Sequence, residues 1–141
     1  MATSQLLIAA VKRGVDVRVI VPSDEQDDVP ATKAAGRSSF GALLEGGVKF
    51  FEYEPTMFHL KTMVVDGIFS TVGSANFDDR SFRLNEEINL FVYDAAFAGL
   101  MKERFLRDQL RCRPCMSAAW KARSLKQRVT EWLVAPFRSE L

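Results

Sequence analysis

One histidine and one lysine, two positions apart, are the side chains of this sequence best suited to chemistry. They are His59 and Lys61, the first members of the pattern H-x-K-x4-D-x6-G-S-x-N, which is complete by Asn76. A phosphodiester is an anion that repels nucleophiles, so its attack requires neutralised charge and a nucleophile that is uncharged yet reactive. A lysine ammonium and a neutral imidazole, which is available near pH 7 because histidine ordinarily titrates at about 6.5, meet both needs. The pattern therefore predicts phosphodiester chemistry without a metal or other cofactor.

A β-hairpin is predicted to hold this pair in place. Two short apolar runs, residues 60–65 and 68–72, are separated by Asp66-Gly67, a strong two-residue turn signal because glycine tolerates a positive φ. Alternation along the first strand would place His59 and Lys61 on one face, within reach of a single phosphate. Asp66 belongs to the pattern, but its position in the turn indicates a structural role more than a catalytic one.

The returning arm of the hairpin carries the neutral hydrogen-bonding groups of the pattern. Ser74 and Asn76 follow the second strand, so their hydroxyl and amide are predicted to arrive beside the histidine and to donate to the same oxyanion. The second ring nitrogen of His59 must hold a proton and be oriented, which calls for a carboxylate. Glu86 or Glu87, on the next predicted strand, would supply it.

The remainder of the chain alternates helices and strands. Helices are predicted to end at Gly14 and to cover residues 33–45, 95–109 and 117–137; further strands are predicted at 15–21, 48–53 and 87–93. This order predicts an α/β sandwich with a mixed central sheet flanked by helices. Such a sandwich usually opens with a strand, whereas this chain opens a few residues before a helix, so an N-terminal strand is expected to be missing.

Charge is unevenly distributed along the chain, although the formal net charge is +1. Residues 1–100 carry 9 basic and 14 acidic side chains, whereas residues 101–141 carry 10 and 4. The acidic balance of the first hundred residues makes nucleic acid an unlikely partner, since polyanions bind basic surfaces. No apolar run is long enough to predict a membrane span, and the start shows no signal-peptide pattern.

The C-terminal part is basic and contains the two cysteines. Cys112 and Cys115 form a C-x-x-C without the second ligand pair of a zinc site, so they are interpreted as free thiols. Residues 1–115 are predicted to be a catalytic half-domain, and residues 116–141 a basic amphipathic helix of the same domain. Two interpretations of that helix stay open: a surface helix docked by its aromatic face, or an interfacial helix beside anionic lipid headgroups.

The motif, continued through residues 77–90, resembles the second catalytic half of bacterial cardiolipin synthases in the phospholipase D superfamily, with its histidine-lysine-aspartate motif. Residues 13–22 resemble the stretch that precedes this motif, so the likeness covers nearly the whole chain. The resemblance implies a phospholipase D-like sandwich in which His59 is the nucleophile or its acid partner. It also implies that Lys61, Ser74 and Asn76 bind the phosphate and that Glu87 orients the histidine.

The resemblance further implies a reaction and a location. A phosphatidyl group would pass from one phosphatidylglycerol to the hydroxyl of a second through a phosphohistidine, releasing glycerol. With water as the acceptor, the same site would be a phospholipase. The partner would be anionic phospholipid, and the chain would lie peripherally on the cytoplasmic side of the bacterial inner membrane.

Enzymes of this kind use two such motifs, one histidine attacking and the other protonating the leaving group. His59 is the only histidine of this chain. Either two chains pair about a twofold axis, or the chain is a piece of a longer enzyme whose N-terminal half supplies the second motif. The missing opening strand favours the second possibility. A homodimeric phosphodiesterase, acting as phospholipase or nuclease, and an inactive truncated fragment stay open as alternatives.

Overall fold

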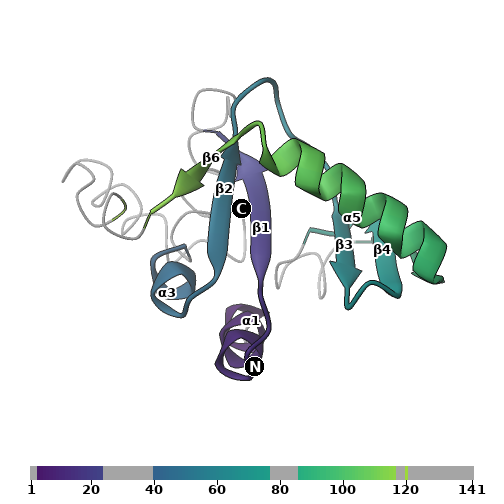
Figure 1. Cartoon of the computed structure of the whole chain (residues 1–141), viewed down its shortest axis with the longest axis horizontal. Helices are drawn as coiled ribbons and strands as arrows, with labels where there is room; N and C mark the ends of the chain where they lie inside the picture. The colour runs from purple at the N-terminus through teal and green to yellow at the C-terminus, as the bar shows by residue number, and fades with distance from the viewer. Residues whose placement is uncertain (1–2, 24–39, 77–85, 117–119, 121–141) are drawn as a thin grey trace. The chain divides into compact units, whose positions relative to one another are not determined.

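The computed structural model describes residues 3–23, 40–76, 86–116 and 120 of the chain. These residues fall into two compact units, which are described separately (Figure 1). The first unit draws on Met1–Phe58 and Cys112–Leu141, and the second unit is His59–Arg111. Most of the predicted C-terminal helix, and the predicted helical residues 33–39, lie outside the described residues.

In its described residues, the first unit contains a mixed three-stranded sheet and two helices (Figure 1). Its elements are α1 (Thr3–Lys12), β1 (Arg18–Pro22), α3 (Phe40–Glu45), β2 (Lys49–Tyr53) and β6 (Cys112–Cys115). Strand β1 pairs in parallel with β2, from Arg18↔Lys49 to Pro22↔Tyr53, and β2 pairs antiparallel with β6. The predicted strand at 15–21 therefore begins three residues later, and Pro22 belongs to the ladder instead of ending it.

The core of the first unit forms where α3 meets β2. Leu43, Val48 and Phe50 are buried, and the alternate residues Val17, Val19 and Val21 of the first strand region pack against them with Leu7, Ile8, Val11, Phe40, Leu44 and Cys115. The Phe40 ring stacks on Phe50 with centroids 4.5 Å apart. Helix α1 ends before Gly14, whose φ of 92° is the left-handed conformation that favours glycine after a helix.

Strand β6 is the element that sequence patterning missed. Its sequence, Cys-Arg-Pro-Cys, has no apolar alternation, and Pro114 lacks the backbone N–H that a central strand needs. Arg113 lies opposite Glu52 and donates to its carboxylate at 2.8 Å, although the Glu52 residue is only 6% exposed. A cross-strand ion pair with a buried carboxylate therefore links β6 to β2. Both cysteines are free thiols, as predicted.

In the second unit, the described residues form an antiparallel sheet that is packed against helix α5 (Figure 1). It contains β3 (Thr62–Val65), β4 (Phe69–Gly73), β5 (Asn89–Tyr93) and α5 (Ala95–Gln109), with β4 in the centre of the sheet. Helix α5 matches its predicted bounds. Its N-cap is Asp94, whose carboxylate accepts a hydrogen bond from the Phe97 N–H at 2.7 Å.

The hairpin of β3 and β4 has the predicted turn. Asp66 and Gly67 both have positive φ, 51° and 68°, as the predicted turn requires, and the Ile68 N–H closes the turn on the Val65 carbonyl at 3.2 Å. The connection is nevertheless one residue longer than predicted, because Asp66, Gly67 and Ile68 all lie between the paired residues Val65 and Phe69. The register runs from Thr62↔Val72 to Val65↔Phe69. The predicted α/β class is confirmed, and in the described residues its strands are divided between two three-stranded sheets.

A buried hydroxyl in the centre of the second sheet offers a first prediction. Ser70 of β4 is fully buried, and its Oγ has no hydrogen-bond partner among the described residues. Because an unpaired buried hydroxyl is destabilising, Ser70→Ala should raise the free energy of unfolding by about 1 kcal/mol in urea denaturation. Ser70→Val should lower it, since the enclosed position has to accept extra carbon. A less stable alanine variant would contradict this description.

An exposed ion cluster in the first unit offers a prediction about pH. Asp16 accepts hydrogen bonds from Arg18 at 2.6 Å and Lys49 at 2.7 Å, and these contacts, Arg18 first, lower its pKa from 3.8 to about 2. The stabilisation is therefore complete above pH 3.8 and is lost as the pH falls through 2. Since water screens this carboxylate, Asp16→Asn should cost less than about 1 kcal/mol at pH 7. The difference in unfolding free energy between the two chains should shrink as the pH falls from 3.8 through 2. A difference that keeps its pH 7 value throughout this range would exclude Asp16 as its cause.

Candidate functional site

The hairpin brings the predicted histidine and lysine together. Both residues precede β3, so they lie on the segment that enters the hairpin and not within the regular strand that alternation predicted. Lys61 is nevertheless held in register, because the Gly73 N–H donates to the Lys61 carbonyl oxygen at 3.1 Å. The side chains converge as expected: Lys61 Nζ lies 2.6 Å from His59 Nε2.

This contact determines which ring nitrogen of His59 carries a lone pair. A lysine ammonium has hydrogen-bond donors only, so Nε2 must be the acceptor. A hydrogen bond from the ammonium to Nε2 requires a neutral imidazole whose proton is on Nδ1. This is the form required of a nucleophile, and the ring is exposed to solvent while Lys61 is half-buried. A phosphate that drew the ammonium towards its own oxygens would leave the Nε2 lone pair available for attack.

Ser74 and Glu87 form a second hydrogen-bonded pair in the same unit. The Ser74 hydroxyl donates to Glu87 Oε2 at 2.5 Å and accepts from the Ile88 N–H at 3.0 Å. The Ser74 N–H in turn donates to the Ile88 carbonyl at 3.0 Å. The β4–β5 pairing thus extends one residue beyond Gly73↔Asn89 and delivers the carboxylate to the motif serine. Sequence reasoning assigned Glu87 to the histidine and did not foresee its bond to Ser74.

The other predicted residues occupy different parts of the unit. Asn76 is exposed two residues after Ser74, and Glu86 is exposed just before Glu87. Residues 77–85, which carry much of the resemblance, lie outside the described residues. Asp66 lies in the turn at the opposite end of β4 from Ser74, so it does not join the other motif residues.

Gly73 explains why the motif needs a glycine before its serine. A Cβ at this position would overlap the Asn89 side-chain oxygen and the Ile88 carbonyl oxygen, and would lie 2.7 Å from the Asn89 Cα. The Asn89 side-chain oxygen also accepts a long hydrogen bond, 3.4 Å, from the Ala75 N–H. Asn89 therefore supports the loop that carries Ser74, a role that sequence reasoning missed. The sequence feature that could have indicated this role is an asparagine at the start of an otherwise apolar strand.

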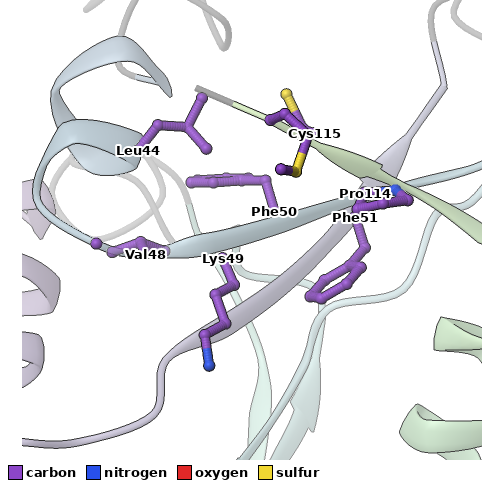
Figure 2. Close-up of a pocket in the computed structure, with 9 residues that line it drawn as sticks. Leu44, Val48, Lys49, Phe50, Phe51, Pro114 and Cys115 are labelled. Atoms are coloured by element: carbon purple, nitrogen blue, oxygen red, sulfur yellow. The ribbon is translucent and has the colours of Figure 1, made fainter. Parts of the chain in front are cut away.

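A pocket of about 340 Å³ is found in the first unit, and none of its lining residues is a predicted site residue (Figure 2). Its walls are mainly apolar and come from α3, β2 and β6, including Leu44, Phe50 and Cys115. The charged member of the lining, Lys49, is paired with Asp16.

Among the described residues, no group of three or more histidine, cysteine or acidic side chains is placed to hold a metal. None of the helices that the structure describes is long and apolar enough to cross a membrane.

Comparison with known proteins connects this site to a family. Residues 2–109 match the family described as "Cardiolipin synthase, PLD-like domain". A cardiolipin synthase of Clostridium perfringens is 35% identical over 92% of this chain and 27% of its own length. A cardiolipin synthase of Geobacillus sp. is 40% identical over 89% of this chain and 24% of its own length. The minor cardiolipin synthase ClsB of Bacillus subtilis is 34% identical over 92% of this chain and 32% of its own length. The chain thus spans about a quarter to a third of these relatives.

A solved structure of a phospholipase D family member has a similar fold. Nuc from Salmonella typhimurium, a phospholipase D family member, aligns with a TM-score of 0.64 over 80% of this chain and 72% of that chain. The identity is 23%, so the likeness concerns the fold alone. The predicted phospholipase D-like fold is confirmed.

Two glycines allow the close approach at Ser74 to be tested. Gly73→Ala should lower the free energy of unfolding by at least about 2 kcal/mol, because the added methyl group meets backbone of β5. Gly99→Ala is the matched control: it lies in α5 with nothing near its Cβ position, and should raise stability by about 0.5–1 kcal/mol. Urea denaturation of both variants checks this. Similar stabilities would show that Gly73 is not tightly enclosed.

Proposed function

The chain belongs to the phospholipase D-like domain family of cardiolipin synthases, and on this premise we propose that it supplies one half of a phosphatidyltransferase active site. The observation that carries the proposal is the contact of 2.6 Å between Lys61 Nζ and His59 Nε2, in a chain whose relatives are cardiolipin synthases. It pairs a neutral nucleophile with the cation that its anionic substrate requires.

In the first step, the phosphate of phosphatidylglycerol binds beside Lys61, and the ammonium turns from the imidazole to a phosphoryl oxygen. His59 Nε2 then attacks phosphorus, forming a P–N bond while the P–O bond to the glycerol headgroup breaks. The departing glycerol oxygen takes a proton from an acid of the second motif. Charge on the phosphoryl oxygens grows in the transition state, where Lys61 and neutral donors stabilise it most.

In the second step, the hydroxyl of another phosphatidylglycerol attacks the phosphohistidine. Its proton passes to the base that the second motif now offers, the new P–O bond forms, and the P–N electron pair returns to Nε2. Cardiolipin is the product; water in place of the lipid hydroxyl would give phosphatidic acid. Asn76 is proposed to bind the phosphoryl oxygens, joined by Ser74 when its hydroxyl proton turns from Glu87 to the phosphate. Glu87 is proposed to hold the serine before the substrate binds and to keep the histidine in position.

The second motif must come from outside this sequence, because His59 is its only histidine. We propose as its source a second copy of the chain or the remaining part of a longer polypeptide. The second source agrees with the fraction of the relatives that this chain spans. Residues 1–115 would form the catalytic half-domain. Basic side chains among residues 116–141 would attract the domain to the headgroups of the cytoplasmic leaflet, where anionic phosphatidylglycerol is the substrate.

A diester with a p-nitrophenolate leaving group tests the half-site without its partner, because nitrophenolate departs near neutral pH without an acid. His59→Ala should reduce nitrophenol release roughly 100-fold or more, and Lys61→Met should also reduce it strongly. Glu103→Gln, which removes an exposed carboxylate on α5, is the control and should leave the rate unchanged. Intact-mass spectrometry should detect a covalent adduct on the unaltered chain but not on His59→Ala. Equal release by the His59 variant would refute the phosphohistidine.

A further inference from the structure

Asn89, the first residue of β5, lies on the same face of its sheet as the lysine of the candidate site. The Gly73 N–H donates to the Lys61 carbonyl at 3.1 Å, which places Lys61 opposite Gly73 and continues the β3–β4 register. On the other side of β4, Gly73 is paired with Asn89. Residues directly opposite one another in neighbouring strands project to the same face. Lys61 and Asn89 therefore share a face, with a glycine between them.

The contacts of the Asn89 side chain determine how its carboxamide is turned. The Ala75 N–H donates to the side-chain oxygen at 3.4 Å, and the same oxygen overlaps the place that a Cβ of Gly73 would take. Because a backbone N–H is a donor only, the accepting atom must be the carboxamide oxygen and not its nitrogen. The oxygen is thus held against the loop that carries Ser74, before any substrate binds.

The nitrogen of this carboxamide keeps two hydrogen-bond donors, and the residues that the structure describes supply no partner for either. The side chain is uncharged and half-buried. A neutral donor that is held in place beforehand suits a phosphoryl oxygen, because negative charge on that oxygen grows as the nucleophile attacks. The free donors of Asn89 therefore have a use on the face that carries Lys61.

We propose that Asn89 is a further catalytic residue, whose carboxamide nitrogen donates a hydrogen bond to a phosphoryl oxygen on the opposite side of Gly73 from Lys61. The proposal rests on the proposed function, since it needs a phosphate beside His59. Neighbouring strands lie about 4.8 Å apart, so the backbones of Lys61 and Asn89 are separated by about 10 Å, which two side chains and one phosphate can span. Gly73 adds no side chain between them. Lys61 would neutralise charge, and Asn89 would stabilise the developing oxyanion.

Replacement by aspartate separates donation to the phosphate from support of the loop. Asn89→Asp keeps an oxygen to accept from the Ala75 N–H, but it loses both donors and turns a negative charge towards the anion. Nitrophenol release from the p-nitrophenyl diester should fall roughly 10- to 100-fold, while the urea midpoint of unfolding stays close to that of the unaltered chain. Full activity in Asn89→Asp would overturn the proposal.

An uncharged variant separates the lost donors from the added charge. Asn89→Leu has neither donor nor charge, and it should also reduce nitrophenol release at least about 10-fold. Undiminished release by Asn89→Leu would show that the aspartate acts by repulsion alone. Loss in Asn89→Leu with full activity in Asn89→Asp would show that the residue only supports the loop. Either result would overturn the proposal.

The neighbouring residue provides a matched control for charge. Leu90 is 62% exposed and, as the next residue of β5, projects to the opposite face of the sheet. Leu90→Asp adds the same charge one residue away, and it should change nitrophenol release by less than about twofold, since water screens an exposed charge. A loss equal to that of Asn89→Asp would contradict a direct contact with the phosphate.

Nuclear magnetic resonance can detect the contact without a variant that changes the site. The chain has three asparagines, so the side-chain ¹⁵N signal of Asn89 can be assigned by its disappearance in Asn89→Asp. Titration with inorganic phosphate should shift this signal with the same dissociation constant as the His59 ring. A ring that responds while the Asn89 signal stays fixed would overturn the proposal. Failure of the proposed function is a distinct outcome, because it appears as undiminished nitrophenol release by His59→Ala.

Discussion

The short contact between the Lys61 ammonium and the His59 imidazole is the interaction on which this account of the protein depends. It selects the neutral ring, places the lone pair on Nε2 and puts a positive charge where a phosphodiester needs one. Neither residue lies in a regular strand, so the contact relies on the hairpin that follows. The bond from the Gly73 N–H to the Lys61 carbonyl ties the entering segment to the returning arm. Fold and chemistry are therefore connected through a few backbone hydrogen bonds.

The third strand completes the arrangement by close packing. Because Gly73 has no side chain, Asn89 and Ile88 approach the end of β4, and Glu87 reaches the Ser74 hydroxyl. The same approach leaves the Ile88 side chain in solvent beside the serine. One steric requirement thus positions a carboxylate beside the hydroxyl of the motif serine.

Local sequence signals predicted what depends on local geometry. Asp66-Gly67 predicted the hairpin because both residues adopt the left-handed backbone that the turn requires, and spacing by two predicted that His59 and Lys61 would converge. Features set by pairing between distant segments were not predictable in this way. Strand β6 depends on Arg113 meeting a buried Glu52, and the bond from Ser74 to Glu87 depends on the β4–β5 register. Neither leaves a periodic pattern in the sequence.

The most direct test of the central claim uses the imidazole of His59, whose nuclear magnetic resonance signals need no assignment because the chain has one histidine. In ¹⁵N-labelled protein at neutral pH, we expect a neutral ring protonated on Nδ1, with Nε2 as a hydrogen-bond acceptor. Addition of inorganic phosphate should shift the Nε2 resonance as Lys61 turns to the anion, and Lys61→Met should weaken this response. A ring protonated on Nε2, or one that ignores saturating phosphate, would contradict the account.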